Sequence, residues 1–463
     1  MAFQDLREYL AVLDRTGKLK RIRKEVDKDW EIAAVARSVF QRFAEADRPG
    51  LVFEKVKGYD IPVAVGVLGA SRQIYAAALE TTPGQVLDKW YHAQKNPIAP
   101  VSVPRGPCKE NIVSGAQVDV LKFPIPVWTA GSDLSPYITA PQVCTRDPET
   151  GVRNVGTYRT QVHAKDRLGI NCGAIHHLAR HVAKNEAQGR PTAVAIVIGT
   201  DPAVAITSVT SMAEELDEFA VAGALRGQPV ELVRCETCDL EVPATAEIVI
   251  EGQMLPGERA PEGPFGEYPG YVSSRSPKFV VHVKCITYRN NPVYQAFLSQ
   301  MPPSESTIIR GIGHEAPLYQ ALKDRHLPVK DVHFTVGGSG AGWLFISLKK
   351  HRPEQVQEVV AAAWETLKPM GKFTVVFDDD IDIFDPVNTQ WAMTFRVQPQ
   401  RDIKIVPNTP ILPHDPSGLA LPDTMKPSKV IIDATMKHEF PALALPPQEH
   451  LDLVAGRWAE YGF

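Results

Sequence analysis

The feature that most constrains the fold is a helix-forming run at residues 306–325, because the sequence pattern differs on its two sides. Before it, from about residue 110 to 291, alternating apolar residues and turn pairs such as Asn290-Asn291 are typical of β-structure. After it, strand-like and helix-like segments alternate. A chain of 463 residues is too long for one ordinary core. The pattern therefore predicts two differently built domains joined by a helix, with a boundary near residue 325.

Periodicity gives further elements on both sides of that helix. Amphipathic helices are predicted at the start of the chain and strands after them, and two helices are expected to interrupt the β-rich part. The first part is predicted to hold helices at 3–17, 30–43, 83–94, 176–188 and 216–226, and strands at 51–56 and 62–67. The later part is predicted to hold regular segments at 332–336, 344–348, 354–367, 373–377, 389–397 and 429–432, and a last helix from about 448.

Composition excludes several classes of function. The formal net charge is −4 and no basic run is interleaved with aromatic residues, which argues against a nucleic-acid partner. No window of about 18 uncharged apolar residues and no basic leader followed by an apolar run occurs, so no membrane segment and a cytoplasmic location are expected. Six cysteines do not make a disulfide framework in so long a chain. Cys235 and Cys238 form a lone CxxC without a second pair nearby, which favours coincidence over a metal or redox site.

Residues 259–271 have neither helical nor strand period and are predicted to form a rigid loop. They contain three glycines and three prolines, which hold Glu262 and Glu267 in a fixed relation. Two acids that share a pocket are a common device for acid–base chemistry, because their surroundings can separate their pKa values. A solvated surface turn is the alternative interpretation of this stretch.

Polar residues at three other places suggest a common site. Asn154 and Arg159 are separated by an odd number of residues on a predicted strand, so a bend or bulge must turn both to one side. His176 and His177 begin a predicted helix, where backbone dipoles favour an anion such as phosphate. Glu218 lies in a helix rich in small residues. Asn154, His177 and Glu218 would make an oxygen and nitrogen ligand set suited to Mn²⁺ or Mg²⁺.

Two further motifs favour a structural interpretation. The glycine-rich residues 337–342 resemble a phosphate cradle, but a strand rather than a helix is predicted to follow them, which indicates a hairpin turn. The aspartates of residues 378–382 lack the glycine and closing glutamate of a calcium loop, so a solvated strand end with helix-capping aspartates is expected.

Taken together, the motifs resemble the UbiD family of prenylated-flavin-dependent decarboxylases. The resemblance extends over nearly the whole chain. Its motifs are Asn154 with Arg159, the His176-His177 pair, Glu218 before Ala222-Gly223-Ala224-Leu225, Glu262-Gly-Pro-Phe-Gly-Glu267, Asp379-Asp380-Ile381-Asp382, Trp391-Ala392-Met393-Thr394, and residues 429–433.

The resemblance implies an α+β fold in three parts. Residues 1–305 would be the catalytic domain, with a small α/β part at about 1–100 and a split β-barrel core at about 110–300 that binds the flavin. Residues 306–325 would be a linker helix. Residues 326–463 would form an α/β domain, ending in a helix, that mediates a homo-dimer or a higher homo-oligomer.

The resemblance also implies a cofactor, prenylated FMN, which serves as the electron sink that side chains cannot provide. Its phosphate would be held through Mn²⁺ (or Mg²⁺) on Asn154, His177 and Glu218, with K⁺ nearby. A separate flavin prenyltransferase would supply it. The flavin would be lined by Asn154, Val155, Gly156, Thr157, Tyr158, Arg159, His176, His177 and Glu218.

Three catalytic residues are implied by the same resemblance. Arg159 would orient the substrate carboxylate, Glu267 would donate a proton to the carbon that loses CO₂, and Glu262 would pair with Arg159. The family chemistry implies a covalent substrate–cofactor adduct and a reversible, non-oxidative decarboxylation. A metal-dependent hydrolase, in which Glu267 activates a metal-bound water, and a non-catalytic flavin-binding subunit are the rival hypotheses.

The substrate is expected to be a small aromatic or heteroaromatic acid. His176 and Tyr268 are predicted to face it, with Leu298 and Met301 on a further wall, and aromatic polar groups favour an aromatic acid over an alkyl acrylate. An α,β-unsaturated acid of the cinnamate type is the alternative substrate. Residues 299–303 contain no basic side chain for a second carboxylate, which argues against a dicarboxylate unless Arg310 reaches the pocket.

Overall fold

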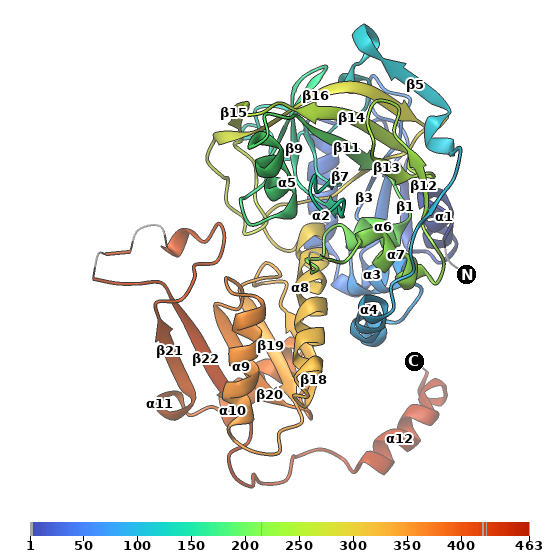
Figure 1. Ribbon diagram of the computed structural model, residues 1–463. Coiled ribbons are helices and arrows are strands. Elements are labelled where there is room, and N and C mark those ends of the chain that lie inside the picture. Colours follow the sequence, from blue (N-terminus) through green and yellow to red (C-terminus); the bar gives the residue numbers. More distant parts are fainter. Residues whose placement is uncertain (1–2, 214, 419–420, 423, 463) are drawn as a thin grey trace.

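The computed structural model of the protein describes residues 3–213, 215–418, 421–422 and 424–462. They form a mixed α+β fold with four sheets, none of which closes on itself within the described ranges. The predicted α+β class is therefore confirmed. Figure 1 shows a large N-terminal body, one long helix and a smaller C-terminal domain beside it.

The first sheet is small and belongs to the N-terminal part of the body. Its strand order is β1-β2-β3-β17, so a strand from near residue 295 completes a sheet begun by the first 65 residues. The strands are β1 (Leu19–Ile22), β2 (Gly50–Phe53), β3 (Val63–Val65) and β17 (Tyr294–Ala296). The helices of this part are α1 (Leu6–Arg15), α2 (Glu31–Arg42), α3 (Arg72–Ala78) and α4 (Val86–Lys95).

The second sheet is the largest and carries much of the candidate site. It has ten strands in the order β6-β9-β10-β16-β14-β11-β7-β8, with β15 and β5 paired to the long β16. The resemblance implied a split barrel here, and the sheet is open. Its strands are β5 (Asn111–Ser114), β6 (Tyr137–Ile138), β7 (Gln142–Arg146), β8 (Arg153–Gly156), β9 (Thr160–Ala164), β10 (Arg167–Ile170), β11 (Thr192–Ile198), β14 (Ile248–Met254), β15 (Arg259–Glu262) and β16 (Ser276–Tyr288).

Helices and a third, three-stranded sheet lie against the large sheet. The helices are α5 (His177–Glu186), α6 (Pro202–Thr207) and α7 (Glu218–Arg226). The third sheet has the order β13-β12-β4, with β4 (Val101–Ser102), β12 (Glu231–Arg234) and β13 (Glu241–Pro243).

The C-terminal domain is built around a fourth, five-stranded sheet with the order β18-β19-β20-β22-β21. The long helix α8 (Glu305–Asp324) leads into it. The strands are β18 (Val329–Phe334), β19 (Trp343–Leu348), β20 (Phe373–Asp378), β21 (Ile403–Pro407) and β22 (Ser428–Ala434), and the helices are α9 (Gln355–Thr366), α10 (Pro386–Arg396), α11 (Pro399–Asp402) and α12 (Gln448–Gly456).

Several sequence predictions need correction. The stretch 259–271 is not entirely loop, because β15 occupies its first four residues and pairs with β16 as far as Glu262 opposite Ser276. The β-rich part is interrupted by α6 as well as by the two predicted helices, and α3 was missed near the start. Both missed helices have at most seven residues, too few to show a helical period.

Of the two motifs that were interpreted as structural, one is confirmed and the other needs correction. Residues 337–342 join the antiparallel strands β18 and β19, as expected of a hairpin turn. Asp378 ends β20 but is only 8% exposed, and Arg396 lies 3.3 Å from its carboxylate and pairs with Asp380 at 2.6 Å. The expected solvated strand end is therefore wrong for Asp378, since an arginine from α10 covers it. Asp385, just beyond the motif, caps α10.

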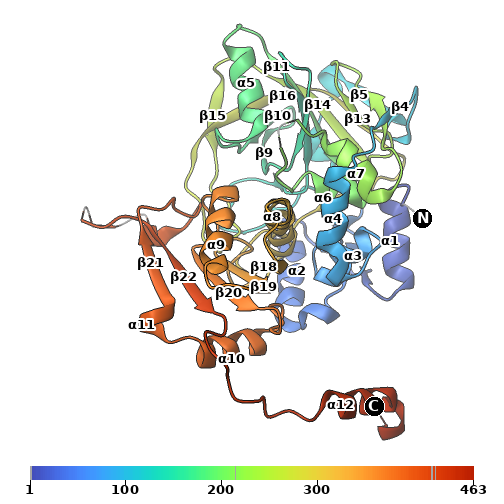
Figure 2. The same cartoon turned by 60° about the horizontal axis from the view of Figure 1, so that its bottom comes forward.

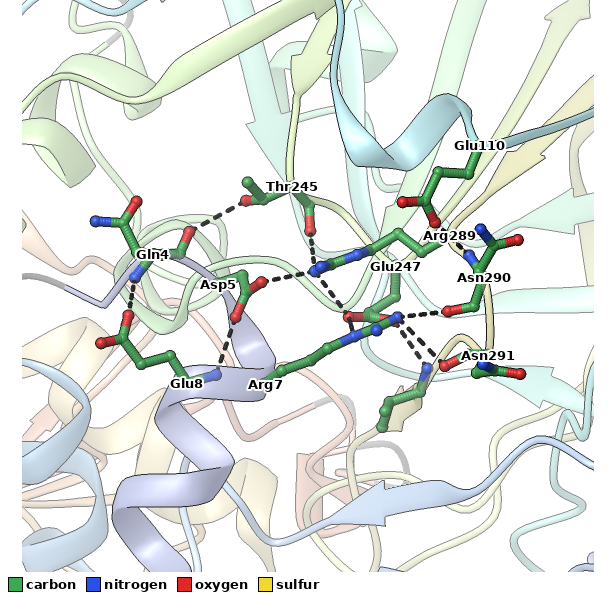
Figure 3. Close-up of polar contacts among 11 residues, drawn as sticks. Gln4, Asp5, Arg7, Glu8, Glu110, Thr245, Glu247, Arg289, Asn290 and Asn291 are labelled. Atoms are coloured by element: carbon green, nitrogen blue, oxygen red, sulfur yellow. Dashed lines mark hydrogen bonds and ion pairs between the residues drawn. The ribbon is translucent and has the colours of Figure 1, made fainter.

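A buried carboxylate joins the first helix to the large sheet. Glu247, fully buried, accepts two hydrogen bonds from Arg7 at 2.7 and 2.8 Å and lies 3.2 Å from Arg289. Arg289 in turn binds Asp5 at 2.7 Å, and the backbone N–H of Val293 donates to Glu247 at 2.9 Å. Figure 3 shows this cluster, in which two arginines balance two acids. It fixes α1 against the strand ends of the sheet.

No helix among the described residues is long and apolar enough to cross a membrane.

Candidate active site

The strand that carries Asn154 ends before Arg159. β8 stops at Gly156, the backbone N–H of Thr157 donates to the carbonyl of Ser208 at 2.8 Å, and β9 starts at Thr160. The odd separation of Asn154 and Arg159 predicted such a bend, and the break between the strands confirms it.

Arg159 lies between the two glutamates of the 259–271 stretch. Its Nε and Nη2 donate to Glu262 at 2.9 and 2.6 Å, its Nη1 donates to Glu267, and its guanidinium lies 4.9 Å from the centre of the Phe265 ring. Glu262 is fully buried and Glu267 is 8% exposed. Burial by itself would lower the pKa of Arg159, but the two carboxylates raise it above its usual value, so the guanidinium stays charged.

A short turn presents Glu267. The backbone N–H of Glu267 donates to the carbonyl of Tyr271 at 2.8 Å, and that of Ser273 donates to the carbonyl of Phe265 at 2.9 Å. Gly270 in this turn has φ +97°, a backbone conformation that residues other than glycine rarely adopt. The strand β15 thus fixes Glu262, and the turn that follows it fixes Glu267.

Asn154 and Glu218 meet on the other side of the strand break. Glu218 is the first residue of α7, is 7% exposed, and accepts a hydrogen bond from the N–H of Val155 at 3.1 Å. Burial raises the pKa of Glu218 to about 8. Asn154 is 3% exposed and its Nδ2 has no hydrogen-bond partner.

His176 and His177 lie at the start of a second helix that contacts the same strand, β8. α5 contacts β8, as α7 does, and it begins at His177 with His176 as its N-cap residue. The edge of the Tyr158 ring packs against His176 at 5.5 Å. Partial burial, together with the charge of Arg310, lowers the pKa of His176. The two histidines therefore lie at the start of a helix that contacts the strand of Asn154.

The donor set at Asn154 and Glu218 fits a hard divalent cation. Glu218 makes no ion pair within the part of the chain that the structure describes, although its carboxylate is buried. The side chain of Asn154, the residue before Val155, is buried in the same place. Oxygen ligands of this kind, with an imidazole, are suited to Mn²⁺ or Mg²⁺.

Two residues that the sequence did not single out as catalytic lie beside Glu267. The ring of Tyr268 is 3% exposed, its hydroxyl donates to the carbonyl of Pro413 at 2.9 Å, and the guanidinium of Arg310 lies 4.0 Å from its centre. Nε2 of His414 lies 3.7 Å from Glu267. A segment of the C-terminal domain therefore reaches the acid. His414 lies in a proline-punctuated tail without any periodic signal, and only the fold could reveal its place.

Arg310 reaches the site from α8. In the described ranges its guanidinium makes no ion pair, and its Nε is buried without a hydrogen-bond partner. The charge of Arg310 also acts on His176 and His314. Of the other residues expected around the substrate, Leu298 is fully buried in the core, whereas Met301 is 61% exposed beside Gly270.

Models of three consecutive protein-family domains match the chain. They are described as the N-terminal, Rift-related and C-terminal domains of 3-octaprenyl-4-hydroxybenzoate carboxy-lyase, and they match residues 10–93, 100–302 and 307–434.

Solved structures are similar over almost the full length. An evolved dimeric form of the UbiD-class enzyme HmfF from Pelotomaculum thermopropionicum, in complex with prFMN, is 40% identical with a TM-score of 0.85, covering 96% of this chain and 98% of that one. The open form of vanillic acid decarboxylase from Sedimentibacter hydroxybenzoicus is 31% identical with a TM-score of 0.88, covering 99% and 100%. The 3,4-dihydroxybenzoic acid decarboxylase from Enterobacter cloacae is 29% identical with a TM-score of 0.85, covering 98% and 100%. The protein is therefore a member of the UbiD family, as its motifs predicted.

Proposed function

We propose that this chain catalyses the reversible, non-oxidative decarboxylation of an aromatic or heteroaromatic acid with prenylated FMN. The observation that carries the proposal is the placement of Arg159 between Glu262 and Glu267, with all three side chains largely buried. Family membership supports a carboxy-lyase, and two of the similar structures are decarboxylases of aromatic acids. The HmfF complex with prFMN supports the choice of cofactor.

The cofactor would supply what the chain lacks. When bound, prenylated FMN accepts the electron pair that remains after CO₂ leaves an sp² carbon, which no side chain can do. Asn154, His177 and Glu218 would hold its phosphate through Mn²⁺ or Mg²⁺. The carboxylate of Glu218, which is buried and makes no ion pair in the described ranges, supports this assignment, as does the buried side chain of Asn154.

The three remaining residues handle the substrate and the proton. Arg159 orients the substrate carboxylate, because its guanidinium stays charged and binds carboxylates through two parallel hydrogen bonds. Glu267 in its protonated form donates its proton to the ring carbon that has lost CO₂, and it removes that proton in the carboxylation direction. Glu262 holds Arg159 in place while Glu267 changes its charge.

The C-terminal domain helps to exclude water from this acid. Tyr268 binds the carbonyl of Pro413, and His414 lies 3.7 Å from Glu267, so two contacts from this domain cover the proton donor. A site closed to water favours carbanion chemistry, because stray protonation and hydration of the charges are prevented. We infer that these contacts form or tighten when substrate is bound.

Arg310 suggests which acids are preferred. Its unpaired guanidinium stacks on Tyr268, the residue next to the proton donor. A second acidic group on the substrate would pair with it, because a partly buried cation without a partner is costly. We therefore propose that the best substrates are ring acids with a second carboxylate or an ionised hydroxyl, in spite of the neutral segment 299–303.

The C-terminal end supports assembly with further copies. Every described residue from Gln448 to Gly462 is exposed, including the apolar Leu451, Leu453 and Trp458. Figure 2 shows α12 extended away from the body. A helix whose apolar side chains find no cover among the described residues supports a homo-dimer or higher homo-oligomer, with the C-terminal domain at the interface. A flavin prenyltransferase remains the expected supplier of the cofactor.

The proposal is tested by producing the protein together with a flavin prenyltransferase and screening a panel of aromatic and heteroaromatic acids. We expect bound prenylated flavin in the mass spectrum and CO₂ release from at least one ring acid. Protein produced without the prenyltransferase serves as the control and should bind FMN without releasing CO₂. Release of CO₂ by that control, or metal-dependent hydrolysis without flavin, would contradict the proposal.

A further inference from the structure

A second group of metal-ligating side chains lies outside the candidate active site, at the tip of the hairpin formed by β12 and β13. The tip is closed by a hydrogen bond from the N–H of Cys235 to the carbonyl of Leu240 at 2.8 Å. Cys235 is 6% exposed and Cys238 is half-buried. Figure 1 shows this hairpin beside β14.

Glu251 on β14 holds the turn between the two cysteines. Its carboxylate accepts hydrogen bonds from the N–H of Glu236 at 2.8 Å, and from the N–H and the hydroxyl of Thr237, both at 2.7 Å. These donors are the two residues between Cys235 and Cys238. The hydrogen bonds therefore bring the carboxylate and both thiols to the same place.

The three ligand atoms are spaced for a single ion. The two Sγ atoms and one carboxylate oxygen lie within 4.8 Å of one another, and the group is the only cluster of three His, Cys, Asp or Glu residues with this spacing in the described ranges. Two thiolates on a tetrahedral Zn²⁺ are separated by about 3.8 Å, given Zn–S bonds of about 2.3 Å. A contraction of about 1 Å at most would therefore complete the geometry.

The charges at this place also favour a cation. Glu251 is 1% exposed and makes no ion pair with any arginine or lysine that the structure describes. The ammonium of Lys109 lies 2.5 Å from the exposed Glu236.

We propose that Cys235, Cys238 and Glu251 bind one soft divalent cation, Zn²⁺ in the first place, with water as the fourth ligand. Each thiol loses its proton on binding, so two thiolates and one carboxylate surround the ion. The sequence shows only the CxxC, because Glu251 reaches the cysteines from a strand of another sheet, through tertiary packing. The donor set is soft and differs from the oxygen-rich set at Asn154 and Glu218, which prefers harder ions. This proposal does not depend on the proposed function.

The ion would stabilise a hairpin that supports the candidate active site. Arg153 of β8, next to Asn154, pairs with Glu241 of this hairpin and with Asp217, the N-cap of α7, at 2.7 Å. Loss of the ion would therefore loosen a structure that positions both Asn154 and Glu218. The expected consequence is a lower unfolding temperature, because an ion bound only by the folded state stabilises that state.

The test is zinc binding by the reduced full-length protein, kept under anaerobic conditions. After dialysis against Zn²⁺ and removal of the excess, mass spectrometry of the metal should find one equivalent per chain that is absent from Cys235→Ser and Cys238→Ser. Cys108→Ala is the matched control, because Cys108 lies in the same apolar cluster outside the ligand group, and it should keep the zinc. The same zinc content in the wild type and in both serine variants, or no zinc in the wild type, would overturn the proposal.

Substitution with Co²⁺ tests the ligands without relying on the serine variants. We expect a near-ultraviolet thiolate-to-cobalt absorption band in the wild type, and at least a 10-fold weaker affinity for Co²⁺ in Glu251→Gln, which can still accept hydrogen bonds from the turn. Absence of the band, or a disulfide between Cys235 and Cys238 that persists in reductant, would contradict the proposal.

Discussion

Two buried clusters of acids and arginines in this protein differ in their charge balance. Around Glu247, two arginines face two acids, and the carboxylate also accepts a backbone hydrogen bond. Around Arg159, one guanidinium faces two carboxylates. The first cluster is balanced without a proton. The second holds one carboxylate more than the arginine can pair with by charge, and His414 lies 3.7 Å from that second acid, Glu267.

The largest effect is expected on the turnover of Glu267→Gln. Glutamine keeps the size and can still accept a hydrogen bond from Arg159, but it has no acidic proton for the ring carbon. Turnover should fall by about 10²–10⁴-fold, the usual contribution of a general acid. CO₂ release by the holoenzyme measures this, with the unfolding temperature as the control for folding. Turnover within a few fold of the wild type would remove Glu267 from this role.

In the balanced cluster around Glu247, a substitution should lower stability and leave activity unchanged. In Glu247→Gln, Arg7 and Arg289 lose a buried counter-charge, and the free energy of unfolding should fall by about 3–5 kcal/mol. Activity per folded molecule should stay unchanged, because Glu247 lies outside the candidate active site. Urea unfolding and activity at low temperature separate the two effects. A loss of turnover without a loss of stability would show that the two clusters do not differ as described.

The pH dependence of unfolding extends the comparison to a third buried acid, Glu315. Burial by itself would raise its pKa, but the charge of Arg72 at 2.9 Å and the hydrogen bond with His333 lower it to about 2. A carboxylate with a lowered pKa stabilises the folded state above its unfolded pKa, and this stabilisation is lost as pH falls from about 4.5 towards 2. The shift corresponds to roughly 3 kcal/mol. In Glu315→Gln, unfolding between these pH values should depend less on pH, whereas an unchanged acid limb would contradict the assignment.

The smallest effect is expected on the KM of Arg310→Met. Methionine at this position keeps an apolar contact with Tyr268. For a substrate with a second acidic group, KM should rise about 10-fold or more, because a charge-assisted hydrogen bond is lost. For the matching monoacid, KM should change little. Equal effects on both substrates would show that Arg310 supports Tyr268 and does not bind the second group.

The sequence predicted the long elements and the chemical groups better than their connections. The helix before residue 325 and the bend between Asn154 and Arg159 could be predicted, because long periodic segments and an odd residue spacing are local signals. The short helices α3 and α6 lack such a signal. So does β15, which is strand only because it pairs with β16.

In the candidate site too, the sequence predicted the residues that a local motif marks and missed those that only tertiary packing brings in. Arg159, Glu262 and Glu267 carry recognisable motifs, and the structure brings them together. His414 comes from a segment nearly 150 residues further along the chain and joins Glu267 only through the position of the C-terminal domain. Contacts of this kind depend on tertiary packing, which a single sequence does not display.

The most direct test of the proton donor is deuterium incorporation during turnover in D₂O. With the wild-type holoenzyme, the product should carry deuterium at the ring carbon that lost CO₂, and the unreactive Glu267→Gln holoenzyme should fail to exchange deuterium into added product. Glu247→Gln should exchange it at the wild-type rate per folded molecule. Exchange by Glu267→Gln at the wild-type rate would contradict the central claim that the acid beside Arg159 moves the proton.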